Sequence, residues 1–149
     1  MGLFDRLTGT SGPRAGAAPL SAAAVRTVLL AINGPGVPYA VREGTPGERA
    51  DLVAEWHVRG LDLRLRTRMR LVPARREVRA VDEQWDGVTR EYGRGPTTTV
   101  SRQWTYERGP DGRRRRVETL RVDPREMRNP LRAAVIGAGW TWRGVLFRL

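Results

Sequence analysis

The sequence predicts an α+β fold. We expect a single, mainly antiparallel sheet of five to seven strands with two helices on one face. The expected order is one helix, five or six strands, one helix and a final strand. Two segments repeat apolar residues with the period of a helix, and several others alternate apolar and polar residues as half-buried strands do. Short turn sequences separate the alternating segments, which favours antiparallel hairpins.

The first helix is predicted to follow Ser21, whose hydroxyl can cap its start. Leu20 can pack on Val25. Gly34 in the left-handed conformation, followed by Pro35, is expected to end it. The spacing i, i+3, i+4, i+7 forms one apolar stripe of Val25, Val28, Leu29 and Ile32.

The second helix is predicted to begin at Asn129, with Pro130 at its first position. Gly139 is expected to end it before a closing strand over Trp140 to Leu149. Its expected apolar stripe consists of Leu131, Ala134, Val135 and Ala138.

Period-two alternation predicts strands over Leu52 to Val58 and Leu61 to Leu71. In the first, Glu55 and His57 face away from the apolar side. In the second, the apolar face opposes four arginines, which we call the arginine row: Arg64, Arg66, Arg68 and Arg70. Only an extended strand with one solvent-exposed face places these two sets of side chains on opposite sides.

A four-residue turn over Pro73 to Arg76 returns the chain as a partner strand over Glu77 to Trp85. This register turns Asp82 and Gln84 toward the core, where we expect a bulge or a frayed strand end to correct it. The alternative is that both line a cavity. The predicted pairs are Leu71 with Val78, Met69 with Ala80, Arg70 with Arg79, Arg66 with Glu83, and Arg64 with Trp85 in a cation–π contact.

A second hairpin is predicted from Thr97 to Glu107 and from Arg113 to Val122, joined by a turn at Gly109 to Gly112. Residues 1–19 are expected to form a flexible tail because Thr8 to Pro19 is nearly free of large apolar residues. Residues 20–149 are expected to form a single α+β domain.

The composition excludes several classes of site. There is no cysteine, which excludes disulfides, thiolate metal sites and a cysteine nucleophile, and His57 is the only histidine. No apolar run is long enough for a membrane span. The start MGLFDRL lacks the features of a secretory signal. We therefore expect a soluble, cytoplasmic protein.

No catalytic, metal or cofactor site is predicted. The stretch from Val135 to Trp140 contains Gly137 and Gly139, but a helix precedes it and too little chain follows for a dinucleotide-binding unit. His57 with Glu55 could act as a general base, yet the pair is also an ordinary strand-surface pair. The acidic residues near the end of the partner strand are expected to pair with arginines: Asp82, Glu83 and Asp86.

The net charge is +11, and all 27 basic residues are arginine. The arginine content is explained by GC-rich codons at least as well as by a need to bind an anionic ligand. The arginine row would be about 20 Å long, which suits successive phosphates of a single nucleic-acid strand. Trp85 could stack a base beside it, and Arg113 to Arg116 would add charge if the second hairpin lies near. The alternative is a solvated surface without a ligand.

The sequence therefore predicts a small non-catalytic binding or interaction protein, with Arg64, Arg66, Arg68, Arg70 and Trp85 as candidate binding residues. The expected partner is a polyanion, such as a single-stranded nucleic acid, or an acidic protein surface. An alternative is a small-molecule pocket between sheet and helices, anchored by Asp82 and Gln84 and lined by tryptophans among Trp56, Trp104, Trp140 and Trp142. A third hypothesis is an enzyme that uses His57.

Three stretches of the sequence are similar to those of known proteins: Ala31 to Pro35, Asp51 to Trp56 and Ala138 to Gly144. They resemble small actinobacterial proteins of the Streptomyces type that have no assigned function. The resemblance covers about Ser21 to Leu149 and agrees with the GC-rich composition. It implies no activity, cofactor or site residue.

Overall fold

The computed structural model describes residues 9–13, 16, 18–86, 101–146 and 149, and it is an α+β structure. Its helices and strands, in chain order, are α2 (Ala22–Leu30), β1 (Ala40–Glu43), β2 (Leu52–Val58), β3 (Leu63–Val72), β4 (Glu77–Asp86), β5 (Ser101–Arg108), β6 (Arg114–Val122), α3 (Arg125–Gly137) and β7 (Thr141–Gly144). None of the helices in these ranges has the length and apolar character needed to cross a membrane.

The strands divide between two sheets, so the expectation of a single sheet is wrong. Five strands pair in the order β1-β2-β3-β4-β7, and β5 pairs only with β6. All pairs are antiparallel except β4 with β7, which is parallel. The chain reaches β7 through α3, and a helical crossover returns a strand in the parallel direction. The closing strand spans Thr141–Gly144, shorter than the predicted Trp140 to Leu149.

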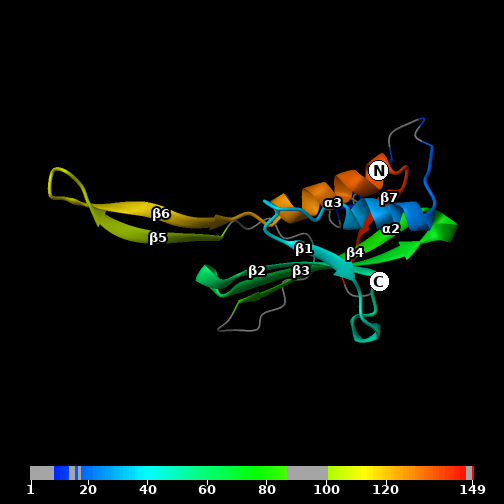
Figure 1. Ribbon diagram of the computed structural model, residues 1–149, viewed down its shortest axis with the longest axis horizontal. Coiled ribbons are helices and arrows are strands. Elements are labelled where there is room, and N and C mark those ends of the chain that lie inside the picture. The colour runs from blue at the N-terminus through cyan, green and yellow to red at the C-terminus, as the bar shows by residue number, and fades with distance from the viewer. Residues whose placement is uncertain (1–8, 14–15, 17, 87–100, 147–148) are drawn as a thin grey trace.

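Both helices lie on the same side of the five-stranded sheet (Figure 1). Their apolar residues pack against the inner face of the sheet, which is the face toward the helices. Three tryptophans are buried in this core: Trp56, Trp140 and Trp142. The most deeply buried residues of this core include Leu29, Leu52, Met69, Leu131 and Val135.

Helix α2 begins as predicted, with the Ser21 hydroxyl accepting a hydrogen bond from the backbone N–H of Ala24 at 3.1 Å. It ends at Leu30, and Gly34 does not adopt a left-handed conformation, so the predicted glycine stop is wrong. The side chain of Asn33 takes this role instead. Its amide nitrogen donates to the carbonyl oxygens of Leu30 and Val41, and its oxygen accepts from the N–H of Val41 at 2.7 Å.

Helix α3 begins at Arg125, five residues before the predicted first position at Pro130. Asp123, not Asn129, satisfies the first turn, because its carboxylate accepts from the backbone N–H of Arg125 at 3.0 Å. Pro130 consequently lies inside the helix. The earlier start adds Met127 to the buried stripe that continues through Leu131 and Val135. Gly139 ends the helix at φ +78°, as expected.

The β3–β4 hairpin has the predicted register at every pair, including Leu71 with Val78, Arg66 with Glu83 and Arg64 with Trp85. The pairing runs without interruption from Val72 with Glu77 to Leu63 with Asp86, so the expected bulge or frayed end is absent. Asp82 therefore faces the core side, where the hydroxyl of Thr67 donates to its carboxylate at 2.8 Å. This hydrogen bond offsets the desolvation that the bulge was expected to avoid.

The β5–β6 hairpin projects along the long axis of the molecule, beyond the sheet and its helices (Figure 1). We call it the arm. Its turn is the predicted one, closed by the N–H of Gly109 donating to the carbonyl of Arg113 at 2.8 Å. The predicted start of this strand, Thr97 to Val100, lies outside the described residues.

Part of the expected tail lies beside β7. Ser11 and Trp142 exchange two backbone hydrogen bonds, at 2.7 and 2.8 Å. The indole N–H of Trp140 donates to the carbonyl of Leu20 at 2.8 Å. These contacts attach the described part of residues 9–20 to the C-terminal elements.

Candidate functional site

The arginine row lies on the outer face of the sheet, away from the helices. Arg64 and Arg70 are exposed, but the side chains of Arg66 and Arg68 are only 21% and 20% exposed. Val53 and Val81, which flank Arg68 on the neighbouring strands, are fully buried on this same face. The middle of the row is therefore largely covered, and the two ends are its exposed part.

Glu83 on β4 pairs with both middle arginines of the row. Its carboxylate accepts two hydrogen bonds from Arg66, each 3.2 Å long, and a third from Nε of Arg68. The Glu83 side chain is only 4% exposed. Charge-assisted, bidentate contacts of this kind are strong and fix the direction of the guanidinium group. Arg66 and Arg68 thus share the negative charge of Glu83 within the fold.

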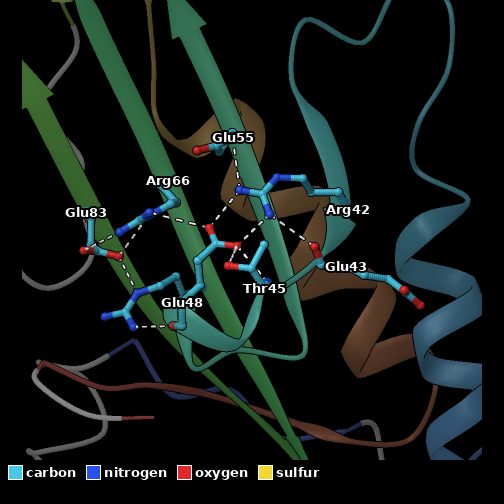
Figure 2. A network of polar contacts seen from close by, with 8 residues as sticks. Arg42, Glu43, Thr45, Glu48, Glu55, Arg66 and Glu83 are labelled. Atoms are coloured by element: carbon cyan, nitrogen blue, oxygen red, sulfur yellow. Dashed lines mark hydrogen bonds and ion pairs between the residues drawn. The ribbon is translucent and has the colours of Figure 1, made fainter.

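A second carboxylate reaches the row from the β1–β2 connection. Figure 2 shows Glu48 between Arg42 of β1 and Arg66 of β3, with Thr45 beside it. Arg42 donates two hydrogen bonds to Glu48, at 2.7 and 2.8 Å, and a guanidinium nitrogen of Arg66 lies 3.6 Å from the same carboxylate. The backbone carbonyl of Glu48 also accepts from Arg68 at 2.9 Å.

Gly44 allows this connection to fold back over the sheet. Its N–H donates to the carbonyl of Asp51 at 2.9 Å, which closes the loop. A Cβ atom at Gly44 would overlap the carbonyl oxygen of Ala50, so no larger residue fits this crossing. The single-turn helix Pro46–Glu48 then places the Glu48 carboxylate over β3.

The contact with Arg42, together with hydrogen bonds from Thr45, lowers the pKa of Glu48 from 4.5 to about 2. The same contact raises the pKa of Arg42. Because the pKa of Glu48 is lower in the folded state than in the unfolded state, its contribution to stability is complete above about pH 4.5. That contribution is lost as the pH falls toward 2.

We expect Glu48→Gln to reduce the loss of stability in acid. At pH 7 the variant should have a free energy of unfolding about 1–2 kcal/mol below that of the wild type. Between pH 4.5 and 2 its stability should fall less than that of the wild type. Urea unfolding at a series of pH values measures both quantities. Glu43→Gln is the control, since that side chain is 69% exposed and its pH profile should match the wild type. Parallel pH profiles for wild type and Glu48→Gln would contradict this expectation.

A third carboxylate, that of the buried Glu77, lies near the C-terminal end of β3 and contacts arginines outside the row. Glu77 on β4, 4% exposed at its side chain, accepts from Nε of Arg79 at 2.8 Å and lies 3.2 Å from Nε of Arg143 on β7. Arg70 donates to the backbone carbonyl of Leu149 at 3.3 Å. Ion pairs between arginine and glutamate therefore occur at several places on the outer face.

Trp85 forms a cation–π contact, but with Arg66 and not with Arg64 directly opposite. The guanidinium carbon of Arg66 lies 4.6 Å from the centre of the ring. The contact is diagonal across the two strands, a distance that long side chains readily span. The structure therefore brings together all five predicted binding residues on one face, with Arg66 stacked on Trp85.

The small-molecule hypothesis placed a pocket at Asp82 and Gln84. The space next to Asp82 has a volume of about 10 Å³, enough for a single water molecule at most. The guanidinium group of Arg128, on α3, lies 3.8 Å from the Asp82 carboxylate. Trp56, Trp140 and Trp142 belong to the packed core and do not line this space.

His57 lies on the outer face of β2, opposite Arg64, and its side chain is exposed. Within the described ranges no hydrogen bond or ion pair holds its imidazole. The neighbouring Glu55 instead contacts Arg42 at 3.4 Å. A general base requires an orienting or accepting group within hydrogen-bond distance. In the part of the chain that the structure describes, no group of three or more acidic or histidine side chains could hold a metal ion.

The tip of the arm carries five exposed arginines: Arg108, Arg113, Arg114, Arg115 and Arg116. Its described side chains near the tip are all exposed from Tyr106 to Arg108 and from Pro110 to Arg116. The strand register pairs Tyr106 with Arg116 and Arg108 with Arg114, so these four lie on one face. We call them the arm patch. The predicted row did not include Tyr106 or Arg108, although their alternation beside the turn indicated a common face.

Comparisons with protein families, with curated proteins and with solved structures find no match to this chain.

Proposed function

We propose that the protein is a non-catalytic, cytoplasmic binding protein that holds a polyanion on the arm patch. The observation that carries the proposal is the arrangement of three exposed arginines, Arg108, Arg114 and Arg116, on one face of a projecting two-stranded ribbon. Glu107, the acidic residue between Tyr106 and Arg108, pairs with Arg115 and lies on the opposite face.

Like charges directly opposite one another destabilise a strand pair. Arg108 and Arg114 are such a pair, with Arg116 next along the strand. A two-stranded ribbon is also only marginally stable in water. The pair of Arg108 and Arg114 therefore carries an electrostatic cost in the free protein, and a bound polyanion reduces this cost.

The arginine row is a weaker candidate because glutamates already pair with its middle arginines. Arg66 and Arg68 would have to leave Glu83 to contact a ligand. Exchanging one anion for another yields little net free energy. Only Arg64 and Arg70, at the two ends of the row, remain exposed.

Titration with inorganic polyphosphate at several salt concentrations tests the proposal. Two double variants remove the same charge from different places: Arg108→Ser with Arg114→Ser on the arm, and Arg64→Ser with Arg70→Ser on the row. We expect the arm variant to weaken binding at least tenfold at low salt. It should also reduce the slope of log K against log salt by about 1.4, since each phosphate contact contributes about 0.7.

The row variant should bind within about twofold of the wild type at low salt. Equal weakening by both variants would contradict a site on the arm. Polyphosphate binding that does not depend on salt, or an absence of binding by the wild type, would contradict the polyanion function itself.

A further inference from the structure

We infer that the ligand of the arm patch is a single-stranded nucleic acid, with a base stacked on Tyr106 and its flanking phosphates on Arg108, Arg114 and Arg116. This inference rests on the proposed function and adds the chemical class of the polyanion. It depends on the aromatic ring of Tyr106, which a polyanion without bases would not need to contact.

Tyr106 is 71% exposed and is one of only two large hydrophobic side chains that are exposed among the described residues. Aromatic rings usually bury most of their surface in a core. Tyr106 belongs to β5 of the arm, which projects beyond the sheet and helices (Figure 1), and it is not part of the hydrophobic core. An aromatic side chain in this position is available for a planar ligand.

The arginines surround this ring closely. Tyr106 lies directly opposite Arg116 and two residues from Arg108 on its own strand. Neighbours on the same face of a hairpin are about 7 Å apart along a strand and about 5 Å apart across it. The patch therefore covers about the area of one or two nucleotides. Proteins that bind single strands combine positive charge along the backbone with aromatic rings that stack on bases.

Duplex nucleic acid fits the arm less well. In a duplex the faces of the bases are stacked on one another, so Tyr106 would have no base to contact. A ribbon inserted in a groove also meets phosphates on both sides. On the reverse face of the arm Glu107 pairs with Arg115, so a carboxylate would face the phosphates on one side of a groove.

The test compares two ligands, an oligothymidylate and inorganic polyphosphate, on the full chain. Tyr106→Leu removes the aromatic ring and keeps an apolar side chain, and Tyr106→Phe keeps the ring. We expect Tyr106→Leu to weaken oligothymidylate binding about tenfold, the scale of one lost base–aromatic stack. Its polyphosphate affinity should stay within twofold of the wild type, and Tyr106→Phe should bind both ligands like the wild type.

Unchanged oligothymidylate affinity in Tyr106→Leu would overturn the inference. If Tyr106→Leu weakened the binding of both ligands equally, the inference would also be overturned, because the effect would then not come from a base. Tighter binding of a duplex than of either of its single strands would overturn it in favour of groove binding.

These failures are distinguishable from a failure of the proposed function. If the double variant Arg108→Ser with Arg114→Ser leaves binding of both ligands unchanged, the arm is not the polyanion site. If that variant weakens the binding of both ligands and Tyr106→Leu weakens the binding of neither, the arm remains the polyanion site and only base stacking is excluded. Tyr106 is exposed, so its variants should retain the wild-type thermal unfolding midpoint.

Discussion

Replacing Glu83 with glutamine is expected to lower the free energy of unfolding by about 2–3 kcal/mol. The variant keeps the size of the side chain and removes the charge that Arg66 and Arg68 share. Removing one partner of a fully buried ion pair costs about 3–5 kcal/mol. The two arginines retain about one-fifth of their exposure, and Arg68 keeps the carbonyl of Glu48, so the loss should fall below that range.

Urea unfolding at neutral pH measures this loss, and Glu55→Gln is the matched control. Glu55 is also on the outer face, but its side chain is 34% exposed and makes one 3.4 Å contact with Arg42. Exposed ion pairs contribute less than about 1 kcal/mol, so the control should remain close to the wild type. If Glu83→Gln were as stable as Glu55→Gln, the conclusion that Glu83 compensates the charges in the middle of the arginine row would be wrong.

Replacing Gly139 with alanine is expected to lower the free energy of unfolding by about 2–4 kcal/mol. Gly139 has φ +78°, and a left-handed conformation costs a residue with a Cβ atom about 1–2 kcal/mol. The added Cβ would also lie 2.7 Å from the Cα of Pro19, a backbone atom that cannot rotate away. The substitution therefore separates the end of α3 from the segment that packs beside it.

Gly137→Ala is the control for this substitution. Gly137 is the last residue of α3, and a Cβ atom there would have no heavy atom within 4 Å. Alanine is the better helix former by up to about 1 kcal/mol, so this variant should be as stable as the wild type or slightly more stable. Thermal unfolding of the two variants measures the difference. A Gly139→Ala midpoint at or above that of Gly137→Ala would show that Pro19 does not pack there.

The β3–β4 hairpin could be predicted residue by residue because two local features determine it. Strict alternation assigns each side chain to a face, and the turn at Pro73 to Arg76 determines which residues are opposite. A shift of one residue would have exposed Leu65 and Met69, both buried here. The same reasoning turned Asp82 inward, and only the partners on other elements, Thr67 and Arg128, show why no bulge is needed.

The start of α3 could not be chosen from local sequence. Asp123 with Pro124 and Asn129 with Pro130 are both an Asx residue followed by proline, the pattern of a helix start. Burial of Met127 against the core distinguishes them, and that burial depends on contacts distant in the sequence. Tertiary packing thus determined the first turn.

The candidate site could be predicted only as a set of arginines on one face. Their ion pairs depend on Glu48, which reaches β3 from a loop between two other strands. Loop conformation cannot be obtained from alternation, although Thr45 and Glu48 have the spacing of a capping box. The sequence therefore predicted an exposed row, whereas the structure exposes its two ends and the separate arm patch.

Chemical-shift mapping of backbone amides tests the location of the site most directly. Inorganic polyphosphate is added to the isotope-labelled protein at low salt, and the change in each amide signal is recorded. The arm patch predicts the largest changes at residues 106–108 and 113–116, with small changes along β3. The largest changes at Arg66 and Arg68, with the tip of the arm unaffected, would contradict the account.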